Sequence, residues 1–239
     1  MFVELNYDPL LEDFYPNGDL KIETILKLME NAGSRHSDKA GDNILKGAAK
    51  GCTWVLTDWY VLIDKTPKYG KKLKVITWTM GATSLFSTSR NFELYCDGEK
   101  VGVGTTKWVR FDLAENKPAK VTDEIMAGYE PESKMVFEDT KLPKIETPAE
   151  WSRICKINLR RGDIDFNHHV HNLTYLDYVM EVLPEDVYDL HHFNRIRLNY
   201  HAPVKAGEEV TAKYSFLNNR HVVFIYGSDD SLRTMVELS

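Results

Sequence analysis

The same order of predicted elements occurs twice along this chain, and the repetition restricts the folds that it can adopt. The first copy predicts a helix over 17–36 and strands over 53–64, 72–80, 87–96 and 101–111. The second copy predicts a strand over 151–159, a helix over 172–182 and strands over 193–201, 209–217 and 221–226. A helix accompanied by a run of antiparallel strands, found twice, indicates an α+β protein with two similar halves.

Local signals support the first half of this assignment. Asp19 is expected to cap the first helix, and an apolar stripe with spacings of three to five residues follows it, formed by Leu20, Ile25, Leu28, Met29 and Ala32. Asp97-Gly98 is typical of a tight hairpin turn between two strands. The first helix is therefore predicted to bury one face against a sheet.

A segment rich in Glu, Lys and Pro separates the copies, with a short helical stretch expected over 122–127. We predict an N-terminal domain over 1–130, a linker over 131–150 and a C-terminal domain over 151–239. In the alignment that we expect, Asp13-Phe14 corresponds to Asp165-Phe166, so that Asn167 matches Tyr15 and His169 matches Asn17. Only the second copy then carries an Asp, an Asn and a His together, which predicts that one half does chemistry and the other holds substrate.

Charge and composition exclude several classes of function. A formal net charge of −6 argues against nucleic acid as a general partner, because binding to phosphates needs a basic surface. The three cysteines are widely spaced, which indicates neither a disulfide framework nor a zinc site. No apolar run is long enough to span a bilayer, and the N-terminus is acidic rather than basic. We expect a soluble cytoplasmic protein that does not bind membranes.

Residues 163–175 hold the densest group of reactive side chains. If this segment is extended, residues two apart point the same way, so Asp165, Asn167 and His169 share one face. A metal site is the alternative, because His168, His169 and His171 lie close in sequence. Their spacing matches no helical His-Glu-x-x-His pattern, so we expect neither a metal nor a cofactor.

The same segment resembles a known family. The pattern Asp165-x-Asn167-x-His169-Val170-x-Asn172-x-x-Tyr175 is similar to the active-site segment of acyl-ACP thioesterases, which have two hotdog domains. The first half resembles that family too, in Trp54-Val55-Leu56-Thr57, Ile63-Asp64-x-x-Pro67-x-x-Gly70 and Thr77-Trp78. The resemblance implies two tandem hotdogs, each a curved antiparallel sheet wrapped round a central helix. It also implies hydrolysis of fatty acyl-ACP to a free fatty acid, which ends chain elongation.

Three residues carry the chemistry that the resemblance implies. Asp165 would be the general base on water, with direct attack on the thioester carbonyl as the less favoured alternative. Asn167 would orient water or the histidine, and His169 would polarise the carbonyl or take the proton. Backbone N–H groups near Val170 and His171, at the predicted start of a helix, are expected to stabilise the oxyanion. The family has a further glutamate or cysteine before the glycine turn of the second half, but residues 200–204 contain neither.

Substrate contacts are less constrained by the sequence. Ile25, Leu28, Met29 and Ala32 are expected to line an acyl tunnel, although ordinary core packing requires the same apolar stripe. Arg160 and Arg161 would dock an acidic acyl carrier protein, and a homodimer is left open. The alternatives are an acyl-CoA thioesterase, a non-catalytic acyl-binding hotdog protein and a hotdog dehydratase that uses Glu181.

Overall fold

The computed structural model describes residues 1–43, 51–139, 141–190 and 192–239. The chain divides into two compact units, Met1–Leu142 and Pro143–Ser239. The division falls inside the predicted linker, and each unit is described by itself.

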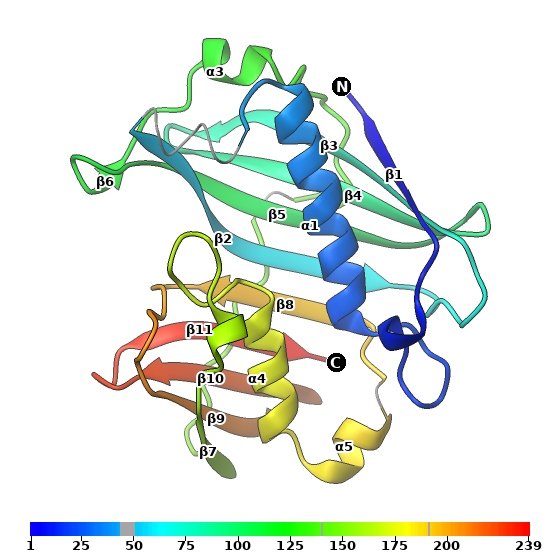
Figure 1. Ribbon diagram of the computed structural model, residues 1–239, viewed down its shortest axis with the longest axis vertical. Helices are drawn as coiled ribbons and strands as arrows, with labels where there is room; N and C mark the ends of the chain where they lie inside the picture. The colour runs from blue at the N-terminus through cyan, green and yellow to red at the C-terminus, as the bar shows by residue number, and fades with distance from the viewer. Residues whose placement is uncertain (44–50, 140, 191) are drawn as a thin grey trace. The chain divides into compact units, whose positions relative to one another are not determined.

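The N-terminal unit contains one antiparallel sheet with the strand order β1-β3-β4-β5-β2, and β6 pairs with the end of β5. A long helix, α1, lies across the strands (Figure 1). The elements are β1 (Val3–Tyr7), a 3-10 turn η1 (Leu11–Asp13), α1 (Ile22–Lys39), β2 (Cys52–Ile63), β3 (Leu73–Ser84), β4 (Ser87–Cys96), β5 (Glu99–Asp112), β6 (Lys117–Pro118) and α3 (Asp123–Ala127).

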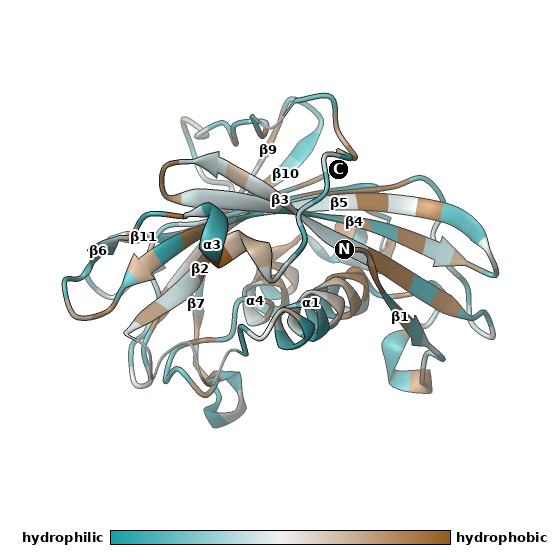
Figure 2. Ribbon diagram, turned by 90° about the horizontal axis from the view of Figure 1, so that it is seen from above, coloured by the Kyte–Doolittle hydropathy of each residue, from teal (hydrophilic) through white to brown (hydrophobic). Residues whose placement is uncertain are grey.

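The apolar stripe of α1 forms the core of this unit. Ile25, Leu28, Met29 and Ala32 are all buried. Close approach of the helix requires Gly104 on β5, because a Cβ there would lie 3.2 Å from the Met29 sulfur. In Figure 2 the ribbon of α1 alternates between brown and teal, as expected of a helix that buries one side.

The C-terminal unit repeats the arrangement with the strand order β8-β11-β10-β9-β7, all antiparallel. Helix α4 lies across its own sheet (Figure 1), and Leu176 and Val179 on α4 are fully buried. The elements are β7 (Arg153–Ile157), the 3-10 turn η2 (Arg161–Asp163), α4 (Thr174–Val182), α5 (Glu185–Leu190), β8 (Arg195–Tyr200), β9 (Val210–Leu217), β10 (Arg220–Gly227) and β11 (Leu232–Leu238).

The predicted α+β class and strand-rich halves are confirmed, but both central helices begin later than expected. Helix α1 begins at Ile22 rather than near Asn17, and Asp19 does not cap it, because the N-cap is Lys21. Helix α4 begins at Thr174 rather than at Asn172. Strands β1, β6 and β11 and helix α5 were not predicted. None of the described helices is long and apolar enough to cross a membrane.

Candidate active site

Asp165 and His169 are the ends of a tight turn in the C-terminal unit, and not members of an extended strand. The Asp165 N–H donates to the His169 carbonyl at 2.8 Å, and the His168 N–H donates to the Asp165 carbonyl at 3.0 Å. His168 has a left-handed backbone with φ 63°, which closes the turn. The expectation of one extended face is therefore wrong, because the backbone reverses between Asp165 and His169.

The turn nevertheless brings Asp165 and Asn167 together. Asp165 Oδ1 accepts the Asn167 N–H at 2.8 Å and the His169 N–H at 3.4 Å, and Asp165 Oδ2 accepts the Asn167 side-chain amide at 3.3 Å. An ionised carboxylate has about four acceptor positions, so these three bonds fix its orientation and leave room for a water. Asp165 is half-buried and Asn167 is exposed, which keeps the carboxylate within reach of solvent.

His169 is half-buried beside the turn that follows β8. It forms an isolated antiparallel β-bridge with Lys205, and the neighbouring Val170 N–H donates to the Val204 carbonyl at 2.8 Å. Within the described part of the chain, the His169 imidazole has no hydrogen-bond partner. Its ring nitrogens are therefore available to a substrate or a water.

The base of the turn is held by a residue that the sequence did not single out for a role. Asp163 is buried, and its Oδ2 accepts the Arg160 N–H and the Tyr178 hydroxyl, both at 2.8 Å. Its carbonyl accepts the His171 N–H at 2.9 Å, so the segments before and after the turn are both bonded to Asp163. Burial, strengthened by the hydrogen bond to Asp163, raises the pKa of Tyr178 and keeps it a donor.

The two arginines expected to dock a carrier protein differ in their surroundings. Arg160 Nε donates to Asp163 Oδ1 at 2.8 Å, and Arg160 also donates to Asp177 on α4 at 3.1 Å. The hydrogen bond to Asp163 raises the pKa of Arg160, while burial raises the pKa of Asp177 against the opposing effect of Arg160. Arg161 is exposed and makes no ion pair with any described residue. Arg160 is thus partly structural, whereas Arg161 presents its charge to solvent.

The expected oxyanion donors are already occupied. The Val170 N–H is bonded to Val204 and the His171 N–H to Asp163, so neither can contact a substrate. The N–H groups of Asn172 and Leu173 have no acceptor among the described residues, and they directly precede α4. These two groups are the candidates that replace the predicted pair.

The N-terminal unit contains the same turn with different side chains. The Tyr15 N–H donates to the Asp19 carbonyl at 2.8 Å, and the Gly18 N–H donates to the Tyr15 carbonyl at 2.9 Å. Tyr15 therefore corresponds to Asp165 and Asp19 to His169. The predicted alignment, which set Asp13 opposite Asp165, is wrong by two residues, because Asp13 forms the base of its turn as Asp163 does.

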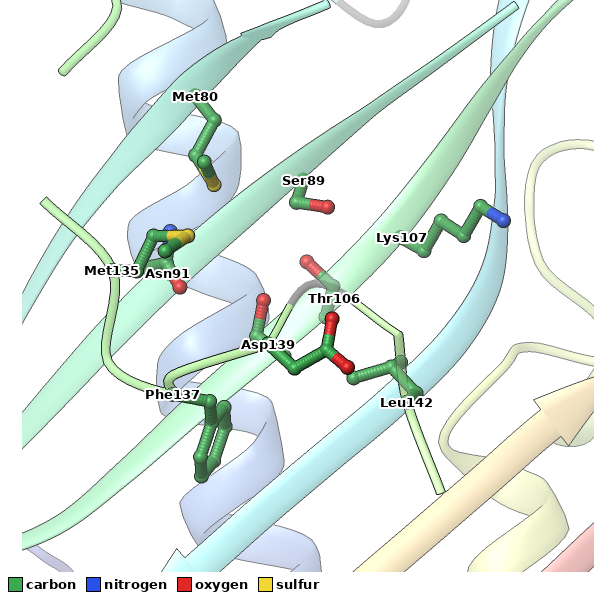
Figure 3. A pocket seen from close by; sticks show the side chains of 10 residues that line it. Met80, Ser89, Asn91, Thr106, Lys107, Met135, Phe137, Asp139 and Leu142 are labelled. Carbon is green, nitrogen blue, oxygen red and sulfur yellow. The ribbon is translucent and has the colours of Figure 1, made fainter. Parts of the chain in front are cut away.

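One cavity in the described part of the N-terminal unit lies away from α1. It lies between the sheet and the segment that includes Phe137 and Asp139, and α1 passes behind the strands (Figure 3). Its volume of about 10 Å³ would hold roughly one water molecule. Asn91 lines it, with an amide nitrogen that has no described partner. The tunnel role of Ile25, Leu28, Met29 and Ala32 therefore stays a prediction.

Among the described residues, no second carboxylate forms a hydrogen bond with Asp165. His201 is exposed and lies 3.2 Å from the Met235 sulfur, and Glu181 is exposed on α4. The described residues contain no group of three or more His, Cys, Asp or Glu side chains that could hold a metal ion. All three cysteines are unpaired and half-buried.

Comparison with known protein families covers both units. Residues 3–129 match the acyl-ACP thioesterase N-terminal domain, and residues 146–237 match the acyl-ACP thioesterase C-terminal domain. The chain belongs to the acyl-ACP thioesterase family. The resemblance inferred from residues 163–175 and from the first-half strands is thereby confirmed.

Comparison with individual proteins supports the same family assignment. Oleoyl-acyl carrier protein thioesterase 1, chloroplastic, from Arabidopsis thaliana is 30% identical over 203 residues, which cover 77% of this chain and 55% of the relative. The chain thus spans about half the length of that relative. The structure of the 12:0-ACP thioesterase from Umbellularia californica matches 100% of this chain and 96% of its own with a TM-score of 0.90 at 17% identity. An acyl-ACP thioesterase from Bacteroides thetaiotaomicron matches with a TM-score of 0.85 at 20% identity, covering 99% of this chain and 96% of its own. These likenesses confirm the double hotdog fold.

Proposed function

We propose that this protein hydrolyses the thioester of fatty acyl-ACP and releases a free fatty acid. The observation that carries the proposal is the turn of residues 165–169, which only the C-terminal unit furnishes with an acid at its start and a histidine at its end. Family membership supports the acyl-ACP substrate, because the named relatives act on acyl carrier protein thioesters.

In the proposed reaction, Asp165 accepts a proton from water that attacks the thioester carbonyl carbon. Asn167 holds the carboxylate through its backbone and side-chain N–H groups, so its role is positioning rather than proton transfer. His169, whose ring has no hydrogen-bond partner among the described residues, either donates to the carbonyl oxygen or receives the proton. The N–H groups of Asn172 and Leu173, which directly precede α4, are the proposed donors to the oxyanion.

The N-terminal unit is proposed to bind the acyl chain. Its turn lacks a carboxylate in the place of Asp165, since Tyr15 occupies that position and donates its hydroxyl to Glu23 at 2.9 Å. The apolar face of α1 at Ile25, Leu28, Met29 and Ala32, which is buried in this structure, is proposed to move aside and border the fatty chain, which would gain about 0.8 kcal/mol per buried methylene.

A dehydratase or a non-catalytic binding protein is less well supported. Glu181 lies exposed on α4, and no hydrogen bond or ion pair among the described residues joins it to the turn of residues 165–169. An assay of the purified chain against acyl-ACPs of several lengths, with the matching acyl-CoAs, tests the proposal. Release of free thiol from acyl-ACP at a higher kcat/KM than from acyl-CoA is expected. A chain that binds acyl-ACP without turnover would contradict the enzymatic role, and equal or faster turnover of acyl-CoA would contradict the choice of carrier.

A further inference from the structure

Lys205 is a cation beside the candidate active site that has no described anionic partner. Its backbone forms the β-bridge with His169, and its side chain is exposed. Neighbouring carboxylates are engaged elsewhere, since Asp165 is bonded to Asn167, and Glu208 pairs with Arg233 at 3.1 Å.

The N-terminal unit shows what a lysine does at this place. Asp19 forms the equivalent β-bridge with Lys68, and the Leu20 N–H donates to the Pro67 carbonyl at 2.9 Å, as Val170 does to Val204. There the Lys68 ammonium forms an ion pair with the Asp19 carboxylate. Residues directly opposite on antiparallel backbones project their side chains to the same side. A lysine at this position can therefore reach the group at the bridge partner.

His169 replaces the aspartate in the C-terminal unit, while the lysine is retained as Lys205. The C-terminal unit thus has the cation of the equivalent ion pair without its anion, and this cation lies opposite His169 of the candidate site. An ammonium in this place can receive negative charge that comes from a ligand or that forms during a reaction.

We propose that Lys205 is a catalytic residue that binds negative charge on the oxygens of the acyl group. The inference rests on the proposed function. When water adds to the carbonyl carbon, the C=O π electrons move to the oxygen and the water proton passes to Asp165. Lys205 then faces this oxyanion. Collapse re-forms the C=O bond and breaks the C–S bond, and Asp165 passes its proton to the departing thiolate. The fatty acid that forms loses its proton to solvent, and Lys205 then faces the product carboxylate.

The test measures how binding to the full chain depends on the charge of the ligand and on the charge of residue 205. Calorimetric titration measures binding of dodecanoic and hexadecanoic acid and of their uncharged amides. The wild-type chain should prefer each acid over its amide. Lys205→Met should lose this preference, with about tenfold weaker binding of the acid, and Lys205→Arg should retain most of it. Lys68→Met is the matched control and should leave the preference unchanged.

Turnover provides the second readout. Lys205→Met should lower kcat for acyl-ACP by about 10² with little change in KM, as loss of an oxyanion donor does. An unchanged acid preference in Lys205→Met, or a rise in KM confined to acyl-ACP, would overturn the proposal, and the second result would make Lys205 a carrier contact. If the wild-type chain prefers the acid through Lys205 but does not hydrolyse acyl-ACP, the proposed function is wrong and anion binding by Lys205 still stands. Thermal unfolding of each variant verifies that it is folded.

Discussion

The two turns at residues 15–19 and 165–169 have the same backbone hydrogen bonds but carry their carboxylates at opposite ends. In the first, Asn17 bonds forward to Asp19, through its Oδ1 to the Asp19 N–H and its amide to the Asp19 carboxylate, both at 2.9 Å. In the second, Asn167 bonds backward to Asp165. The carboxylate lies at the end of the first turn, where Asp19 is buried and pairs with exposed Lys68, but at the start of the second turn, where solvent can reach it. The comparison teaches that a structural turn becomes a candidate catalytic site through side-chain exchange on an unchanged backbone.

Removing the acid from each turn should give the largest contrast. Asp165→Asn preserves the size of the side chain but cannot accept a proton from water, so kcat for acyl-ACP should fall by about 10²–10⁴. Asp19→Asn in the other turn should leave kcat close to the wild-type value, although it removes the ion pair with Lys68. Cys155→Ala should also be harmless. Equal losses for Asp165→Asn and Asp19→Asn in folded proteins would mean that the two turns have the same role.

Acid should weaken the N-terminal unit more than the C-terminal unit. His36 on α1 is fully buried, its Nδ1 lies 2.8 Å from the Arg90 guanidinium, and burial followed by the charge of Arg90 lowers its pKa to about 4. In the C-terminal unit burial also lowers the pKa of His221 on β10, but its Nδ1 lies 3.0 Å from the Tyr214 hydroxyl rather than beside a buried guanidinium. Since the unfolded state takes up the His36 proton first, the stabilisation is fully present above about pH 6.5 and is lost as the pH falls towards 4, by about 3 kcal/mol in total.

Hydrogen exchange at several pH values measures this effect unit by unit. The protection factors of the α1 amides, which correct for the slower intrinsic exchange in acid, should fall below pH 6.5. His36→Gln, which can keep both hydrogen bonds, should flatten this dependence. An unchanged pH dependence in that variant would assign the acid sensitivity to other groups.

Charge reversal at the adjacent residues Arg160 and Arg161 should have two different effects. Arg161→Glu should raise KM for acyl-ACP several-fold, by about 1 kcal/mol, spare acyl-CoA and lose its effect at high salt. Arg160→Glu should instead lower the unfolding temperature, because it sets a carboxylate against Asp163 and Asp177. Salt-independent kinetics of the wild-type chain on acyl-ACP would refute electrostatic docking.

Exchanging the fourth residue of the turns should give the smallest effect. Gly18 and His168 both have positive φ, 81° and 63°, which glycine adopts without strain. His168→Gly should therefore stabilise the chain by about 0.5–1 kcal/mol, and Gly18→His should destabilise it by a similar amount. Denaturant unfolding measures both. A destabilised His168→Gly variant would show that the imidazole makes a contact that offsets its backbone strain.

Periodicity and turn residues were sufficient to predict most strands, since Ser87–Cys96 and the Asp97-Gly98 turn are where the sequence placed them. The residue-by-residue correspondence between the two turns could not be predicted from the sequence. The repeated Asp-Phe dipeptide suggested a register that the hydrogen bonds exclude, and only a backbone trace shows that Tyr15 corresponds to Asp165. Asp163 and Lys205 were missed as functional candidates for the same reason, because their roles depend on contacts between residues far apart in sequence.

Asp165 and Asn167 were predicted to act together and do lie together, but through a turn rather than a strand. Val170 and His171 illustrate the limit of helix-start signals. Their N–H groups are bonded to Val204 and Asp163, and no sequence pattern reveals that these acceptors are nearby.

The most direct test is a chimera in which residues 165–169 are replaced by the sequence of residues 15–19. The backbone hydrogen bonds of the two turns agree, and the transplanted aspartate would face Lys205 as Asp19 faces Lys68, so the chimera should fold and unfold at a temperature close to that of the wild-type chain. Its hydrolysis of acyl-ACP should be abolished. A folded chimera that still hydrolyses acyl-ACP at the wild-type rate would show that the chemistry lies elsewhere in the molecule.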